Sequence, residues 1–390
     1  PLAYDAALDI VYIPTGVGTP DIWGGNRTEL HERYANSMLA LNASTGKLVW
    51  NFQTTHHDLW DMDVPSQPTL TDIKDKSGKM VPAIYVLTKT GNAFVLDRRT
   101  GAAIVPITEK PVPQTVKRGP QTKGERYSAT QPFSDFDLAP KEKLTDKQMW
   151  GATMFDQLMC RVSFHKLNYD GIYTPPSENG TLVFPGNLGV FEWGGMSVNP
   201  DRQIAVMNPI GLPFVSKLIP ADPNRPKTAK GAGTEAGVQP MYGVPYGVEI
   251  SAFLSPFGLP CKQPAWGFVA GVDLNTHEVA WKRRIGTIRD SLPGIQLPPF
   301  KMGVPMLGGS ISTAGNVMFV GGTQDNYIRA INVTNGDELW KGRLPAGGQA
   351  TPMTYEANGK QYVVIMAGGH GSFGTKMGDA LVAYALPDAK

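Results

Sequence analysis

Short segments in which apolar and polar residues alternate recur along the whole chain, separated by turns rich in glycine. In four places an apolar strand ends in Asp or Asn, a polar turn follows, and a second strand begins; these places are residues 40–50, 94–105, 271–281 and 330–340. Three of the turns end in Gly, which a tight hairpin favours because it needs a positive φ, and the other ends in His277. The pattern predicts four β-hairpins, three of which close on Trp.

A second strand–turn–strand element accompanies these hairpins, at residues 1–16, 196–209, 310–322 and 351–369. The hairpin turns recur at a spacing of about 55–60 residues or its multiples, so the two elements together describe four-stranded antiparallel units that repeat at roughly the period of a propeller blade. The expected fold class is therefore all-β, a β-propeller. A β-sandwich is the alternative, but sandwiches do not repeat at a fixed period.

Two stretches interrupt the repeat and are expected to be long loop insertions. Residues 106–150 are rich in Pro, Lys and Gln, and residues 216–265 are rich in Pro and Gly. Long loops on a rigid scaffold often carry function. Within this part of the chain the spacing of apolar residues predicts one short helix at about 142–160.

Composition supports short strands joined by turns, since the 390 residues include 44 Gly and 33 Pro. The net charge of +2, with 18% charged residues, gives no sign of a nucleic-acid surface, so no nucleic-acid partner is expected. No run approaches 18 apolar residues, and no signal peptide is recognisable. The strand pattern starts at the first residue, so we expect an N-terminal portion to be missing.

The segment HHDLWDMD, residues 56–63, has the highest density of catalytic side-chain types. A zinc site is disfavoured, because adjacent His56 and His57 point to opposite faces of an extended chain. Asp and His could instead satisfy backbone groups at a corner. The third interpretation is a carboxylate base beside a hard cation, a common way to take a proton from an alcohol.

Three further places are candidates for ligand binding, each with a structural alternative. Lys89 precedes a predicted strand and could be solvated or bind an anionic ligand. Glu192 and Trp193 lie between glycines, which allow backbone to approach a ligand, although ordinary turn chemistry around a core Trp gives the same pattern. His370 lies in a glycine-rich loop, which could be plain surface. No nicotinamide-binding G-x-G-x-x-G pattern follows a strand.

Whole phrases of the chain resemble a known family. HHDLWDMDVPSQPTL, KTGNAFVLDRRTG, TPPSENGTLVFPGNLGVFEWGG and GGHGSFGTKMGDALVAYALP are similar to the membrane-bound quinoprotein glucose dehydrogenases, within the pyrroloquinoline quinone (PQQ) alcohol dehydrogenase superfamily. The resemblance implies an eight-bladed propeller with PQQ near its axis and Ca²⁺ or Mg²⁺ beside it. Residues 1–390 would be the C-terminal part of one PQQ-binding domain, about five blades, with the first blades and the membrane anchor absent.

The resemblance also implies roles for particular residues. Asp61 matches the catalytic base, with a tentative metal contact, and Lys89 matches the basic residue that touches the quinone oxygens. Thr19 lies where the family places metal and cofactor contacts, although Val17 stands where related enzymes have an Asn ligand. The remaining matches face the cofactor or the sugar: Glu192, Trp193 and Asn208 toward PQQ, and His370 toward the substrate.

The implied activity is oxidation of D-glucose at C1 to the lactone, with hydride passed to PQQ and electrons to ubiquinone, at the periplasmic face of the bacterial inner membrane. Quinate, shikimate or another polyol is the alternative substrate; the absence of Arg from residues 367–379 favours a neutral sugar. A non-catalytic scaffold or inactive fragment is the alternative of another class. Cys160 and Cys261 could be two buried thiols or one bridge, and the resemblance favours the bridge.

Overall fold

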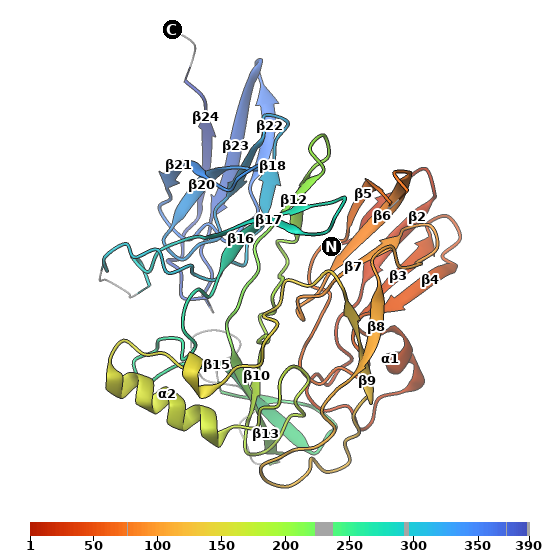
Figure 1. The fold of residues 1–390 in the computed structure, drawn as a ribbon, viewed down its shortest axis with the longest axis vertical. Helices are drawn as coiled ribbons and strands as arrows, with labels where there is room; N and C mark the ends of the chain where they lie inside the picture. The colour runs from red at the N-terminus through yellow and green to blue at the C-terminus, as the bar shows by residue number, and fades with distance from the viewer. Residues whose placement is uncertain (76, 223–236, 292–295, 372, 388–390) are drawn as a thin grey trace. The chain divides into compact units, whose positions relative to one another are not determined.

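The computed structural model describes residues 1–75, 77–222, 237–291, 296–371 and 373–387 (Figure 1). Contacts divide the chain into two compact units. Unit 1 comprises Pro1–Leu70, Pro82–Phe191 and Gly211–Gln263, and unit 2 comprises Thr71–Val81, Glu192–Ile210 and Pro264–Lys390. Each unit is built mainly from short antiparallel strands.

Within the described residues, five sheets take their strands in chain order, as the repeat predicts. The first sheet is β1(Ala3–Asp5), β2(Ile10–Pro14), β3(Ser37–Asn42) and β4(Leu48–Gln53), and the next is β5(Thr69–Lys74), β6(Met80–Leu87) and β7(Ala93–Asp97). In unit 2 they are β11(Met196–Asn199), β12(Ile204–Met207), β16(Phe268–Asp273) and β17(Val279–Arg284); β18(Ser310–Ser312), β19(Val317–Val320), β20(Tyr327–Asn332) and β21(Glu338–Arg343); and β22(Met353–Ala357), β23(Lys360–Ala367) and β24(Ala380–Ala385). The prediction of antiparallel units is confirmed; three of these five sheets have the predicted four strands and the other two have three.

The turns of the repeat share one hydrogen-bond pattern that explains the Asp or Asn before each turn. The Asn42 side-chain oxygen accepts from the backbone N–H of Thr45 at 2.9 Å, and Asn332 accepts from Thr334 at 2.8 Å. Gly46 and Gly336 then adopt positive φ angles of 68° and 77°. Such a side chain mimics a backbone turn and fixes the hairpin.

The hairpins at 94–105 and 271–281 keep this hydrogen bond, from Arg99 N–H to Asp97 at 2.9 Å and from Asn275 N–H to Asp273 at 2.7 Å, but each differs in another respect. In the hairpin at 94–105, the strand after the turn is reduced to a single β-bridge between Leu96 and Ala103. In the second, His277 takes the glycine position with a φ of 60°, a conformation uncommon for a residue with a side chain.

Each of two buried tryptophans packs on the turn of the sheet that follows it in the sequence. Trp50, 8% exposed, donates from Nε1 to the carbonyl of Arg98 at 3.1 Å. A Cβ added to Gly101 would lie 2.9 Å from the Trp50 ring, so the ring packs directly on this glycine. Trp281, 6% exposed, repeats the arrangement in unit 2, on the turn that contains Gly336. The terminal Trp of the motif therefore joins consecutive sheets.

The two insertions contain strands and are more than open loops. In the first, β8(Ile107–Pro111) pairs with β9(Thr130–Ser134). The second contributes β13(Phe214–Pro220), β14(Val238–Pro240) and β15(Tyr246–Ala252), which form a sheet of order β10-β13-β15-β14 with β10(Thr181–Val183). Residues 223–236 of the second insertion lie outside the described residues.

The helix boundaries predicted at 142–160 are wrong. A 3₁₀ turn, η1(Asp146–Gln148), comes first, and the helix α2(Met154–Lys166) begins only where the Thr153 hydroxyl accepts the N–H of Asp156 at 3.1 Å. This capping contact sets the start of the helix. A six-residue helix, α1(Glu29–Tyr34), was not predicted. None of the described helices has the length and apolar character of a membrane span.

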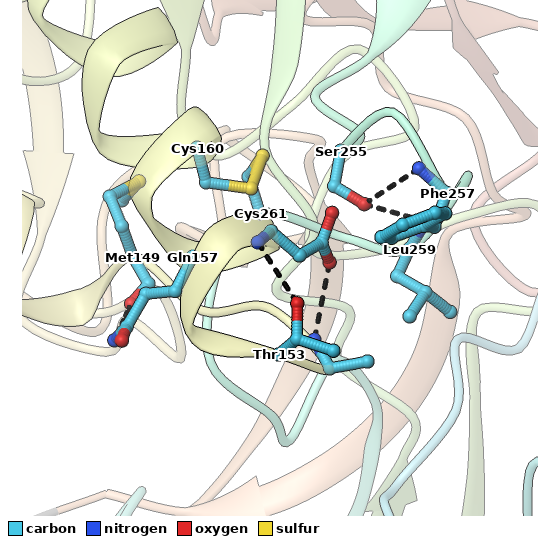
Figure 2. Close-up of a disulfide and its surroundings, with 10 residues drawn as sticks. Met149, Thr153, Gln157, Cys160, Ser255, Phe257, Leu259 and Cys261 are labelled. Carbon is cyan, nitrogen blue, oxygen red and sulfur yellow. Dashed lines mark hydrogen bonds between the residues drawn. A yellow bond between two sulfur atoms is a disulfide. The ribbon is translucent and has the colours of Figure 1, made fainter.

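A disulfide joins Cys160 of α2 to Cys261, in the segment after β15 (Figure 2). Both cysteines are fully buried, in a cluster with Leu144, Met149 and Phe253. The bridge favoured by the family resemblance is therefore present in the structure.

Candidate active site

The segment HHDLWDMD forms a tight turn organised by Asp58. The buried Asp58 carboxylate accepts the backbone N–H of Trp60 at 2.8 Å and of Met62 at 2.6 Å. Asn36 donates to the same carboxylate at 2.8 Å. Burial raises the pKa of Asp58 to about 6. Asp58 thus holds the backbone on which the next acidic residues stand.

Buried and partly exposed positions alternate from Trp60 to Asp63, so that two carboxylates lie at the edge of the buried cluster. Leu59, Trp60 and Met62 enter a hydrophobic cluster with Tyr173. The side chains of Asp61 and Asp63 stay 27% and 25% exposed. Asp61 has a φ of 60°, an uncommon conformation that the surrounding contacts maintain and that is typical of functional positions.

Lys89 lies between these two carboxylates. Its ammonium donates to Asp61 Oδ2 at 2.8 Å and to Asp63 Oδ2 at 3.2 Å. Its backbone N–H donates to the carbonyl of Asp63 at 3.1 Å, and its carbonyl accepts from Val190 at 2.8 Å. The structure therefore brings the predicted residues Asp61 and Lys89 together and adds Asp63 to them.

Two glycines make this close approach possible. A Cβ on Gly189 would meet the Lys89 side chain at 2.5 Å, and a Cβ on Gly16 would meet Asp63 Oδ1 at 2.7 Å. The N–H of Val17 donates to that same oxygen at 2.7 Å. The loop that contains Val17 thus contacts the Asp63 carboxylate through its backbone.

The three charges push the pKa values of the two carboxyl groups apart. Burial raises the pKa of Asp61 well above its usual range; the Lys89 ammonium opposes this shift and the charge of Asp63 adds to it. Burial acts in the same direction on Asp63, but Lys89 and the hydrogen bonds from Asp61 and Val17 hold its pKa below the usual value. A carboxylate with a raised pKa is the better proton acceptor.

The two histidines have structural partners. His56 lies between Gln53 and Glu109, at 2.7 Å and 3.0 Å. The buried His57 bridges Glu32 at 2.9 Å and Glu125 at 3.0 Å. These contacts agree with the interpretation of the histidines as parts of the scaffold.

The remaining predicted residues of unit 2 lie on turns and loops. Glu192 is buried, and its carboxylate accepts the N–H of Trp193 at 3.2 Å. The rings of Trp193 and His370 are 5.7 Å apart, inclined at 31°. Asn208 is buried and donates to the carbonyls of Met306 and Gly308, at 3.2 Å and 3.3 Å. The structure thus places Trp193 beside His370 within unit 2.

Thr19 is exposed, in the loop that contains Val17. Its role stays a prediction. Asp58, Asp63 and the backbone of Val17 were not predicted. The D-x-D spacing of Asp61 and Asp63 was a visible signal for the second carboxylate, whereas nothing in the sequence indicated the backbone contact.

Carboxylate oxygens suit Ca²⁺ or Mg²⁺, and Asp61 and Asp63 offer two carboxylates beside one another. Within the described ranges, however, no group of three or more His, Cys, Asp or Glu side chains is arranged around a common point. These residues fit part of a coordination shell. The ammonium of Lys89 fits a quinone oxygen or a carboxylate of PQQ, since both are hydrogen-bond acceptors.

A cavity of about 620 Å³ opens elsewhere in unit 1. Thr90, Asn92, Lys110, Phe133 and Tyr169 are among the residues that line it, and neither Asp61 nor Lys89 is. The cluster of Asp61, Asp63 and Lys89 therefore does not line this cavity.

Comparison with known proteins agrees with this arrangement. A family model described as PQQ glucose/ethanol/alcohol dehydrogenase, beta-propeller domain, matches residues 1–363. The chain is 87% identical to quinoprotein glucose dehydrogenase A of Acinetobacter calcoaceticus and 66% identical to quinoprotein glucose dehydrogenase of Escherichia coli, over 100% of its own length and 49% of each relative. A probable quinate dehydrogenase of Xanthomonas campestris is 43% identical, over 100% of the chain and 50% of that relative.

The chain thus spans about half the length of the curated relatives it matches. Among solved structures, quinohemoprotein alcohol dehydrogenase from Comamonas testosteroni has a TM-score of 0.58 at 22% identity, over 98% of this chain and 47% of that one. At that identity the likeness supports the fold alone. Because the family model covers residues 1–363 and the sheets are the antiparallel units that such a domain requires, the chain belongs to the PQQ-dependent glucose/ethanol/alcohol dehydrogenase β-propeller family.

Proposed function

We propose that the protein to which this chain belongs oxidises an aldose at C1, D-glucose to its lactone, with PQQ as the first electron acceptor and ubiquinone as the second. The observation that carries the proposal is the contact of Asp61 with Lys89 at 2.8 Å, between the two residues that the family resemblance names as base and cofactor contact. The 87% identity to a quinoprotein glucose dehydrogenase supports the sugar substrate.

Asp61 is the proposed general base. Its raised pKa favours removal of the C1 hydroxyl proton of the sugar, and the turn held by Asp58 fixes its position. Lys89 is the proposed cofactor contact, a hydrogen-bond donor held in place by Asp63. When bound, PQQ supplies the hydride acceptor, and Ca²⁺ or Mg²⁺ beside it supplies a Lewis acid.

The unit 2 residues have proposed roles in binding. Glu192, Trp193 and Asn208 would face the cofactor, and His370 the sugar. The neighbouring rings of Trp193 and His370 support cofactor and sugar sites that lie next to each other. Thr19 is proposed to contact the cation and cofactor from the loop whose backbone reaches Asp63 at Val17.

The proposed location is the periplasmic face of the bacterial inner membrane, with a membrane anchor in the remaining part of the protein. Ubiquinone is a lipid, so its reduction takes place at a bilayer. The Cys160–Cys261 disulfide supports an oxidising compartment, because disulfides are rare in the reducing cytosol.

The proposal is tested with the Asp61→Asn variant of the complete protein, loaded with PQQ and Ca²⁺ or Mg²⁺. Loss of a general base costs about 10²–10⁴-fold in rate, so glucose-dependent dye reduction should fall by that factor while PQQ still binds in a spectroscopic titration. Asp201→Asn, at an exposed turn, is the matched control and should keep full activity. Turnover of Asp61→Asn at the wild-type rate would remove Asp61 from the mechanism.

The second candidate function is the same chemistry on quinate or shikimate, which the 43% identity to a probable quinate dehydrogenase keeps open. Dye reduction with each substrate in parallel decides between them. A complete protein that reduces dye with no sugar or polyol, with PQQ and the cation present, would instead be a non-catalytic scaffold.

A further inference from the structure

The helix α2 presents five of its apolar residues outward, whereas Phe164 packs toward the buried cluster around Cys160. Met154 and Phe155 are 76% and 74% exposed, and three more apolar residues follow on the same stripe: Leu158 at 55%, Met159 at 47% and Val162 at 40%. The spacing of i and i+4 places these five side chains on one face. A surface helix of a globular protein normally shows the opposite arrangement, with its apolar stripe toward the core.

This orientation is fixed by contacts on the opposite face of the helix. Asp156 and Cys160 are buried there, and Cys160 is bonded to Cys261 (Figure 2). Gln157 donates to the carbonyl of Met149 at 3.0 Å. Because the inner face already has its partners, α2 cannot turn its apolar stripe inward without breaking them.

Basic residues accompany the apolar stripe. Arg161, His165 and Lys166 are exposed in the C-terminal half of α2, and Lys147 is exposed on η1, which packs beside the helix. The acidic neighbour Asp146 lies 3.7 Å from His165. Aromatic and aliphatic residues next to cations are typical of a helix that lies in the interface of a bilayer containing anionic lipids.

The segment bonded to α2 continues the same character. It ends at Cys261 and includes Phe257, which is 68% exposed, and Leu254, which is 44% exposed. Figure 2 shows Phe257 beside Ser255 and Leu259, in the loop that leads to Cys261. A covering protein surface would have to bury Arg161 and Lys166 as well, at a desolvation cost, whereas lipid headgroups would pair with them.

We infer that α2 is a membrane-docking helix, whose face Met154, Phe155, Leu158, Met159 and Val162 inserts into the headgroup region of an anionic bilayer while Arg161 and Lys166 contact lipid phosphates. This rests on the proposed function in one respect, since a ubiquinone-reducing protein works at a membrane. Docking through α2 orients unit 1 toward the lipid phase.

The test labels the complete protein with an environment-sensitive fluorophore at Leu158→Cys and reconstitutes it in nanodiscs of phosphatidylglycerol with brominated acyl chains. Both cysteines of this chain are disulfide-bonded, and wild-type protein put through the same labelling gives the background. Quenching by bromolipid should be roughly threefold stronger than at a label on Ser44→Cys, an exposed hairpin tip. Met154→Cys is the second label site if the first variant does not fold.

The other outcomes overturn the inference. Quenching by aqueous iodide at position 158 means that the helix faces water, and resistance to both quenchers means that another part of the protein covers it. The double variant Arg161→Glu/Lys166→Glu should weaken bromolipid quenching in anionic discs, and an unchanged signal would contradict the role of anionic lipid. None of these readouts needs turnover, so lipid contact without glucose oxidation would defeat only the proposed function.

Discussion

At the scale of single residues, burial and two neighbours of opposite charge set the basicity of Asp61. Burial raises its pKa, Lys89 opposes that shift, and Asp63 adds to it. A catalytic base must be ionised to accept a proton. The fall in kcat/KM on the acidic side of its pH profile, the acid limb, therefore follows this pKa. Changing either neighbour should move the limb in a known direction.

We expect Asp63→Asn to move the acid limb of kcat/KM for dye reduction to lower pH, because removal of a negative neighbour lowers the pKa of Asp61. Lys89→Met should move the limb to higher pH, because the ammonium no longer favours the ionised form, and it should also weaken PQQ binding. The measurement is the pH profile of glucose oxidation at saturating PQQ and cation. Shifts of both variants in the same direction would contradict the electrostatic role of the pair.

The sequence identified Asp61 and Lys89 only through whole phrases shared with a family. Local pattern alone left Asp61 as one of three readings of HHDLWDMD, because its left-handed φ and the buried Asp58 beneath it come from tertiary contacts. Asp63 was missed although it follows two residues later. Its importance arises from Lys89, which is 26 residues away in sequence.

At the scale of elements, the hairpins were predictable, whereas the helix was predicted in about the right place with the wrong boundaries. Each hairpin is specified by its local sequence, since an Asp or Asn fixes the turn and a following residue accepts a positive φ. The boundaries of α2 were missed because its apolar stripe faces outward, so apolar spacing did not mark a core-facing helix. The capping Thr153, three residues before Asp156, was the better signal.

Substitution of two turn glycines, Gly46 and Gly336, distinguishes the cost of a left-handed backbone conformation from the cost of a steric clash. At Gly46 a Cβ would meet nothing within 4 Å, so Gly46→Ala should cost only the left-handed conformation, about 1 kcal/mol of unfolding free energy. At Gly336 the same Cβ would meet the Trp281 ring at 2.4 Å, so Gly336→Ala should cost clearly more. Denaturant unfolding measures both.

Asn tolerates the left-handed conformation, so Gly46→Asn is the control and should recover part of the loss at that turn. Equal costs for Gly46→Ala and Gly336→Ala would show that Trp281 does not pack on the following turn as described.

At the scale of the whole molecule, the repeat predicted the sheets whose strands are arranged in chain order, and it could not predict the sheet that departs from that order. The sheet β10-β13-β15-β14 pairs β10 with strands from the second insertion, and no local period encodes that pairing. The disulfide encloses this same part of unit 1, since Cys160 and Cys261 are 101 residues apart and β10, β13, β14 and β15 all lie between them. The bridge therefore constrains the region in which sequence pattern gives the least guidance.

Closing a loop of this length removes conformational entropy from the unfolded chain, an effect of about 4–5 kcal/mol in the chain-entropy model. The double variant Cys160→Ser/Cys261→Ser should accordingly lose several kcal/mol of unfolding free energy in unit 1, measured by denaturant unfolding. Peptide mapping of the denatured, unreduced wild type should recover the two cysteines in one linked pair. Reductant should destabilise the wild type once the buried sulfurs become accessible and leave the double variant unchanged. Two outcomes would contradict this prediction: recovery of both cysteines of the wild type as free thiols, or unfolding of the two proteins at the same denaturant concentration. Either would mean that the hydrophobic cluster around Leu144 and Phe253 holds α2 and the sheet β10-β13-β15-β14 together without help from the bridge.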